Sequence, residues 1–394
     1  MALNVLVIGG GMAGAAAALT ARAAGVRVML VARGPGATAL SSGAADIGNR
    51  GRHPYPLLPE GAIDDGLRFL RSLGYAGDGN LWLLSPLGCP KPTALAQPFI
   101  AAGDLKALPR DARPAVVALC GSQAIEARLQ AAGLAKYFPE AIALPVEFYV
   151  HRSDALRTIP EIAADLDQPG RRAQLADVLK RAARSSGATH LYLATLGYAP
   201  EPIDAGVPVY EMLSAPPSVP GLRLQRSIEK ALSDAGVEFR SGIVEKRPDG
   251  GVQVISGTTC EPLEPQAIVL ATGRFIGGGI RSDDRLRETV FDLPVWAGER
   301  QKLVPLPSEE LFSQKASGRH VGLTAGLREL RYDRIHAAGA VVGGYDPSRD
   351  EGGLGVAAVL GVAAGRAAAQ NVQNVQNARE RASRCRWPRG AAAS

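Results

Sequence analysis

The sequence predicts an α/β protein whose first domain is Rossmann-like. Residues 4–8 form a continuous apolar run, residues 12–24 are alanine-rich with a helical pattern, and a second apolar run covers residues 26–31. Continuous apolar runs of this length are typical of strands that are buried on both faces of a parallel sheet. Strand, helix and strand in this order therefore predict a βαβ unit at the amino terminus.

The turn between the first strand and the helix carries a phosphate-binding pattern. Gly9, Gly11 and Gly14 have the spacing G-x-G-x-x-G, and Met12 and Ala13 lie within it. The first glycine permits a tight turn, the second lets a phosphate approach the backbone, and the third lets the helix pack closely on the strand. We therefore expect these five residues to bind the phosphate of a nucleotide cofactor.

The second strand lacks the acidic residue that usually bonds an adenosine ribose. Ala32 stands where Asp or Glu is expected, and Arg33 follows it. Arg33 is a candidate charge-assisted donor to a phosphate, although a solvated surface arginine is an equal alternative. The 2′-phosphate of NADP and the phosphate of flavin mononucleotide (FMN) are both ligands that this arrangement allows.

The remainder of the chain predicts a small antiparallel meander and an inserted α/β domain. Strand patterns near residues 115–120 and 190–197 flank helical patterns, and residues 237–257 alternate around a turn. We expect a discontinuous cofactor domain, an inserted domain that binds substrate or a partner, and a basic, disordered tail. The cofactor domain is expected to comprise residues 1–60, 218–285 and 331–375. The inserted domain is expected to comprise residues 61–217 and 286–330, and the tail residues 376–394.

Composition excludes several functional classes. The net charge of +6 and the isoelectric point near 9.2 come largely from the tail, where five arginines stand against Glu380, and no aromatic residues alternate with basic ones. We therefore expect no nucleic-acid partner. Four scattered cysteines without a CxxC pair predict no metal or iron–sulfur site. No uninterrupted apolar run reaches about 18 residues, which predicts a cytoplasmic protein.

Two later segments favour a flavin as the nucleotide, because they resemble segments that border the flavin in two-dinucleotide-domain flavoproteins. Thr272 and Gly273 end a buried strand pattern, and Gly339 lies in a second glycine-rich turn whose next residue, Ala340, replaces an acid that flavoproteins often carry. The second segment continues into a small-residue helix whose N-terminal dipole can stabilise negative charge on a reduced flavin. The residues that open this helix are Gly352, Gly353, Leu354 and Gly355.

Five motifs, in order along nearly the whole chain, resemble the B-subunit family of anaerobic glycerol-3-phosphate dehydrogenases. They are SSGAADI (41–47), SPLGCPKPT (85–93), PPSVPGLRLQ (216–225), VLATGRFIGGG (269–279) and AGAVVGGYDP (338–347). The resemblance implies the FAD/NAD(P)-binding superfold and oxidation of sn-glycerol 3-phosphate to dihydroxyacetone phosphate, with the electrons passed to quinone. It also implies two partners, an FAD-bearing subunit of the same complex and an iron–sulfur membrane subunit, which would hold the chain peripherally at the inner membrane.

The cofactor implied by the resemblance is FMN, with FAD as the alternative. FMN has no adenosine, so a βαβ unit that binds only its phosphate would not need an acid at Ala32. Ser41, Ser42 and Gly43 are expected near N5 and O4 of the flavin, where donors tune the ring. An ordinary Ser-Gly turn is the alternative for these three residues.

Several charged residues and histidines are candidates for the chemical step. Lys91, Arg274 and Arg331 could bind the substrate phosphate, with paired surface charges as the alternative. His320, and after it His336, could take the proton of the substrate hydroxyl, with a structural histidine as the alternative. Other functions also stay open, namely an FAD-dependent, fumarate-reductase-like oxidoreductase of another substrate, and a non-catalytic scaffold or electron-relay subunit.

Overall fold

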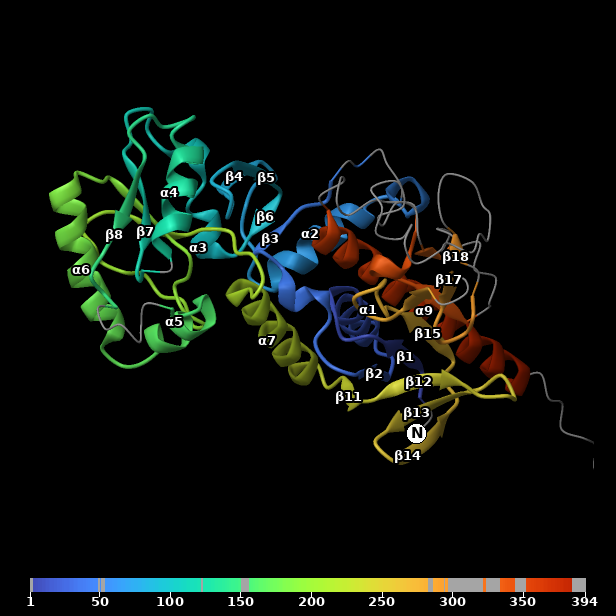
Figure 1. The fold of residues 1–394 in the computed structure, drawn as a ribbon. Coiled ribbons are helices and arrows are strands. Elements are labelled where there is room, and N and C mark those ends of the chain that lie inside the picture. The colour runs from blue at the N-terminus through green and yellow to red at the C-terminus, as the bar shows by residue number, and fades with distance from the viewer. Residues whose placement is uncertain are drawn as a thin grey trace, which may run out of the picture.

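A computed structural model confirms the α/β fold and the Rossmann-like first domain (Figure 1). Five parallel strands form its central sheet in the order β11-β2-β1-β15-β20. Their bounds are Glu238–Ser241, Val28–Ala32, Val5–Ile8, Ala267–Leu270 and Ile335–Ala337. The structure describes residues 3–48, 50, 54–121, 123–149, 156–282, 286–293, 295–296, 322–323, 334–343 and 352–384.

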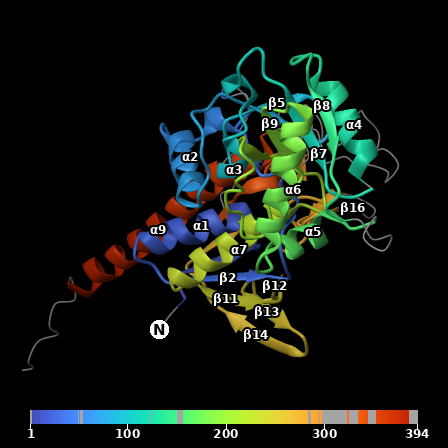
Figure 2. The same ribbon diagram turned by 90° about the vertical axis from the view of Figure 1, so that its left-hand side faces the viewer.

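Helices α1 (Met12–Ala23) and α9 (Gly353–Arg384) pack against each other beside this sheet, as both ribbon views show (Figures 1 and 2). The alanines at positions 15–18 of α1 are completely buried. A Cβ on Gly365 of α9 would lie 2.3 Å from the carbonyl oxygen of Ala17. Small residues on both helices therefore bring the two backbones into direct contact. Two further helices border the domain, α2 (Ala62–Ser72) and α7 (Val219–Asp234).

The prediction of a disordered tail from residue 376 is wrong for its first part. Helix α9 continues to Arg384, and residues 385–394 lie outside the described residues. Alanine, glutamine, arginine and glutamate favour helix, so an exposed polar sequence of this kind can extend a helix whose apolar part is already anchored.

Helix α9 also contains a long apolar stretch that polar residues interrupt in the sequence. Within the described residues, Gly353–Ala378 is the one helical segment long and apolar enough to span a membrane, with a mean hydropathy of 1.3. However, 67% of its most apolar window is buried inside the protein, against α1 and its neighbours. Its apolar character is that of a core helix.

The antiparallel meander follows β11, the strand after α7. It contains β12 (Ile243–Lys246), β13 (Val252–Ser256) and β14 (Thr259–Leu263). The expected meander began at residue 237, but β11 pairs in parallel with β2 and extends the main sheet instead.

The second body is a parallel α/β unit with strand order β10-β9-β7-β8 (Figure 1). Its strands are Val209–Glu211, His190–Leu193, Pro114–Ala118 and Ile142–Pro145. Its helices are α4 (Gln123–Leu134), α5 (Ile159–Leu166) and α6 (Arg171–Ser186).

Short antiparallel strand pairs and helical turns complete the structure. The pairs β3 with β6 and β4 with β5 are antiparallel, as are β16 with β17 and β18 with β19. These strands span Ala44–Ala45, Leu95–Ala96, Leu81–Leu84, Pro90–Thr93, Ile280–Ser282, Leu286–Glu288, Val295–Trp296 and Gly322–Leu323. Helical turns are η1 (Ala37–Leu40), η2 (Tyr55–Leu57), α3 (Pro98–Ala101), η3 (Leu105–Ala107) and η5 (Gly339–Val341).

A buried ion pair joins the second body to α7. Arg223 of α7 donates to the carboxylate of Glu211 at the end of β10, and the two residues are 8% and 1% exposed. The backbone N–H of Leu196 also donates to Glu211, at 3.2 Å. Because both charges are desolvated, neither can lose its partner without leaving a costly unpaired charge. This pair therefore restricts how the second body sits on α7.

The contact between α1 and α9 predicts a large effect of a side chain at Gly365. Gly365→Leu should lower the free energy of unfolding by about 1–3 kcal/mol or more, because the new side chain would meet the Ala17 backbone, which cannot move alone. Gly353→Ala, in the same helix but with open space around its Cβ, should change it by less than about 0.5 kcal/mol. Urea unfolding of the three proteins measures both values, and equal effects of the two substitutions would contradict this packing.

Burial of His336 in β20 predicts a pH-dependent stability. Burial lowers the pKa of His336 to about 4 from an ordinary value of 6.5, so between these values the unfolded chain binds a proton that the folded chain does not. The free energy of unfolding should therefore fall as the pH drops from 7 to 4, by up to about 3 kcal/mol. His336→Gln should remove this part of the slope, and an unchanged difference between pH 7 and pH 4.5 would count against it.

Candidate functional site

The glycine turn lies at the carboxyl edge of the sheet, directly against the end of β15. Gly9 has φ +120°, and a Cβ there would lie 2.2 Å from the carbonyl oxygen of Ala271. A Cβ on Gly14 would lie 1.8 Å from the carbonyl oxygen of Gly9. Both positions therefore require glycine, because any side chain would displace backbone atoms. The glycine turn therefore brings the start of α1 against the turn that follows β15.

The N-terminus of α1 is capped by a residue from the loop that follows β2. The backbone N–H of Met12 donates to Oγ1 of Thr38 at 2.8 Å, and Thr38 is 7% exposed. A Cβ on Gly11 would lie 3.2 Å from the same oxygen. The Thr38 hydroxyl accepts one hydrogen bond there and keeps its own proton to donate, which suits a phosphate oxygen next to the helix dipole.

Thr38 is a candidate residue that sequence reasoning missed. It lies in the small, polar loop after the second strand. The signal available was a hydroxyl residue shortly after the Rossmann strand. Only the tertiary fold shows that this hydroxyl reaches the glycine turn.

The position expected to bind a ribose holds no carboxylate. Ala32 is buried, and its Cβ would lie 2.9 Å from a Cβ built on Gly10. Arg33 follows it and is exposed. The edge of β2 therefore presents a methyl group beside the turn.

The turn after β15 contributes a buried hydroxyl. Oγ1 of Thr272 is buried and has no hydrogen-bond partner among the described residues. Gly273 follows it with φ +75°. Arg274 is 7% exposed and donates to the carbonyl oxygens of Ala340 and Val342, at 3.1 and 3.5 Å. These contacts tie the turn at Thr272 to the turn at Gly339, so in the structure Arg274 holds two loops together.

The other predicted glycine segments also meet at this edge. A Cβ on Gly339 would lie 2.6 Å from Cβ of Ala13, next to the glycine turn. At the start of α9, a Cβ on Gly355 would lie 2.1 Å from the carbonyl oxygen of Asp46, and one on Gly352 would lie 3.0 Å from the backbone of Ile47. The start of α9 therefore packs directly on the segment that continues from Ser41–Gly43. Gly353 is exposed and Leu354 is half-buried.

The structure does not bring the described candidates for the chemical step together at the glycine turn. His320 and Arg331 lie outside the described residues. Lys91 lies in β5, opposite Leu83 of β4, and no described contact joins it to the glycine turn. His336 is 8% exposed, its Nε2 lies 3.0 Å from Nδ2 of Asn371 in α9, and its pKa is depressed by burial. This environment is that of a structural histidine.

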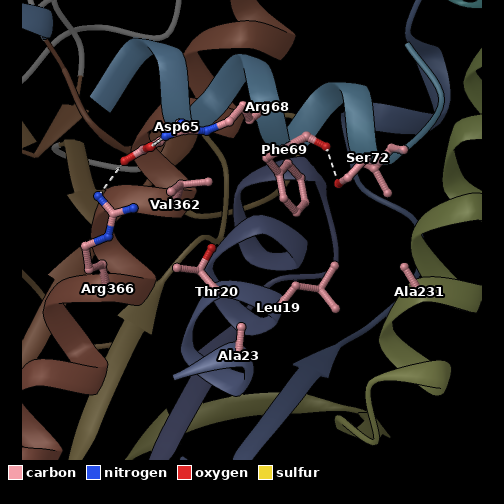
Figure 3. Close-up of a pocket in the computed structure, with 11 residues that line it drawn as sticks. Leu19, Thr20, Ala23, Asp65, Arg68, Phe69, Ser72, Ala231, Val362 and Arg366 are labelled. Atoms are coloured by element: carbon pink, nitrogen blue, oxygen red, sulfur yellow. Dashed lines mark hydrogen bonds and ion pairs between the residues drawn. The ribbon is translucent and has the colours of Figure 1, made fainter. Parts of the chain in front are cut away.

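An open groove of about 490 Å³ lies away from the glycine turn (Figure 3). Leu19, Ala23 and Phe69 provide an apolar lining, while Asp65 at one end pairs with Arg366 of α9 at 2.5 Å and with Arg68. The hydrogen bond from Arg366 lowers the pKa of Asp65. The groove borders later turns of α1, so it is separate from the candidate cofactor site.

The residues present fit a flavin nucleotide. A backbone turn without side chains, the capping hydroxyl of Thr38 and the unpartnered hydroxyl of Thr272 provide a small, donor-rich surface. Segments from four parts of the chain, near residues 9–14, 41–48, 272–279 and 352–355, reach that surface. Ala32 is the one position at which the expected contact to an adenosine ribose is missing.

Part of this region matches a known protein family. Residues 4–66 match a family model described as an FAD binding domain. Among solved structures, flavin-dependent brominase Bmp2 is 11% identical with a TM-score of 0.36, covering 95% of this chain and 80% of the other. The open conformation of a flavocytochrome c3 fumarate reductase is 13% identical with a TM-score of 0.37, covering 94% and 78%. Similarity at this level does not indicate a function.

Relatives similar over at least 90% of this chain give a more specific result. A probable B subunit of anaerobic glycerol-3-phosphate dehydrogenase from Halobacterium salinarum is 28% identical over 94% of this chain and 98% of its own length. The B subunit of Yersinia pseudotuberculosis is 28% identical over 90% and 95%, and that of Vibrio vulnificus is 25% identical over 92% and 95%. The resemblance inferred from the motifs is thus confirmed. The chain is similar over most of its length to B subunits of anaerobic glycerol-3-phosphate dehydrogenases, and its residues 4–66 match an FAD binding domain.

Proposed function

We propose that this chain is a flavin-bearing subunit of a complex that oxidises sn-glycerol 3-phosphate to dihydroxyacetone phosphate and passes the electrons to quinone. The observation that carries the proposal is the meeting of the predicted glycine segments at one edge of the sheet, in a chain whose relatives are similar from end to end. Such an edge, outside the carboxyl ends of parallel strands, is where doubly wound folds bind their ligands.

The chain's own residues have distinct roles in this proposal. The backbone at Gly11 and the hydroxyl of Thr38, at the start of α1, receive a phosphate of the cofactor, and Thr272 donates its hydroxyl to the nucleotide. The start of α9 faces the ring and stabilises negative charge through its dipole. A bound flavin supplies the two-electron oxidation of an alcohol to a ketone. Gly353 and Leu354 remain accessible at that helix start.

The flavin that we propose is FAD. FMN, which the sequence predicts first, finds no support in the comparisons, because the matching family model is described by its FAD binding. The missing acid at Ala32 then means that the adenosine ribose is held without its usual carboxylate partner. Arg33, exposed beside that position, is available to a phosphate oxygen instead.

The substrate and partners rest on the names of the relatives. Because those relatives are named as one of several subunits, they support a multi-subunit complex, in which we propose an FAD-bearing partner and an iron–sulfur membrane partner. Those partners would pass electrons to quinone and hold the chain at the cytoplasmic face of the inner membrane. We propose His320 as the base for the substrate hydroxyl, and Arg331 and Lys91 as ligands of its phosphate.

The proposed phosphate site at Gly11 and Thr38 predicts a sharp loss of cofactor when Gly11 is replaced by a larger residue. Gly11→Val should lower flavin content at least tenfold, because its side chain would fill the space between the turn and Thr38, 3.2 Å away. Gly34→Val is the matched control, since a Cβ at Gly34 meets nothing within 4 Å. The ratio of visible to ultraviolet absorbance measures flavin per chain. Full flavin content in the Gly11 variant would exclude a phosphate site at this turn.

The proposed reaction predicts that dye reduction depends on this chain. Glycerol 3-phosphate should reduce an artificial electron acceptor in the assembled complex, and the rate should fall at least tenfold with the Gly11→Val chain and little with Gly34→Val. The physical reason is that only the first variant empties the flavin site. A complex that retains its full rate with the Gly11 variant would show that this chain serves as a scaffold.

A further inference from the structure

The segment Ser41–Gly43 is held from one side through its backbone carbonyls. The carbonyl oxygen of Ser41 accepts from Oγ of Ser218, that of Ser42 accepts from the N–H of Ser214 at 3.0 Å, and that of Gly43 accepts from the N–H of Gln97 at 2.9 Å. All three donors lie where the chain passes between the two bodies. Three consecutive carbonyls therefore face the junction.

Gln97 makes two of the contacts that fix this arrangement. Its backbone bonds Gly43, and its side-chain Nε2 donates to the carbonyl oxygen of Pro220 in the first turn of α7, at 2.7 Å. Gly43 has φ +95°, and a Cβ there would lie 2.3 Å from Cδ1 of Ile100 and 2.9 Å from Cβ of Pro220. Gln97 thus connects the segment to α7 at a point with no free space.

The geometry of the peptide bond directs the N–H of Ser42 away from the junction. The carbonyl oxygen and the following N–H of a trans peptide point in opposite directions, and the peptide between Ser41 and Ser42 is trans. Since the Ser41 carbonyl faces Ser218, the N–H of Ser42 points away from the junction. That N–H and the Ser42 hydroxyl have no partner among the residues that the structure describes.

We propose that Gln97 is a positioning residue for the flavin: it holds Ser41–Gly43 so that the N–H of Ser42 donates to the N5–O4 edge of the ring. The proposal rests on the flavin site proposed above. A donor fixed at that edge stabilises the charge that the ring gains on reduction, so it raises the reduction potential of the bound cofactor. Because Gln97 belongs to the junction, the placement of the second body then influences the potential.

The decisive variant is Gln97→Met, which keeps the backbone N–H and the side-chain length but loses the Nε2 donor. We expect flavin content to stay unchanged. The ratio of reduced to oxidised flavin, in equilibrium with a reference dye, should fall about fivefold, as for the loss of one neutral hydrogen bond. Gln168→Met is the matched control, because the exposed side chain of Gln168 donates to the carbonyl oxygen of Ala164 within the second body. It should leave the ratio unchanged.

Each outcome separates this inference from the function on which it rests. An unchanged ratio in a Gln97 variant that retains its flavin would overturn the role of Gln97 and leave the flavin site intact. A wild-type chain that binds no flavin would overturn the proposed function itself. If the Gln97 variant fails to fold, Ser218→Ala decides, because it removes the donor to the Ser41 carbonyl and should lower the same ratio. An unchanged ratio there would contradict the proposal.

Discussion

The structure depends on backbone contacts that leave no room for side chains where the first helix begins. Gly14 packs against the carbonyl of Gly9, and Gly9 packs against Ala271 at the end of the neighbouring strand. The same principle continues along α1, where the alanine face meets Gly361 and Gly365 of α9. Close-packed interiors transmit such constraints, so the turn, the strand end and the last helix occupy fixed places relative to one another. The candidate cofactor site is a consequence of this packing.

The candidate site is completed by parts of the chain that a Rossmann-like domain alone does not contain. The loop after β2 supplies Thr38 and Ser41–Gly43, and the junction with the second body holds the latter through Gln97, Ser214 and Ser218. Nearby, the buried pair of Glu211 and Arg223 restricts the second body's position. The edge expected to face the ring thus depends on the insertion as much as on the nucleotide-binding unit.

Local patterns predicted much of this fold, and tertiary contacts explain what they missed. The βαβ unit, the glycine turn and the parallel second sheet follow from apolar runs and glycine spacing, which act within a few residues. Thr38 and Gln97 could not be found in this way, because their partners lie 26 residues away or further along the chain. The polar composition of residues 376–394 predicts disorder, and for this reason the sequence does not reveal that α9 continues past residue 376. The same residues favour helix once an apolar segment anchors them.

The central claim is that the glycine-lined edge holds a flavin, and direct chemical identification of the bound cofactor tests it. The purified chain is denatured by heat, and the released compound is identified by chromatography against FAD, FMN and nicotinamide nucleotides. The account predicts FAD at about one molecule per chain, bound despite the missing acid at Ala32. A chain that releases no flavin, or that releases a nicotinamide nucleotide instead, would contradict it.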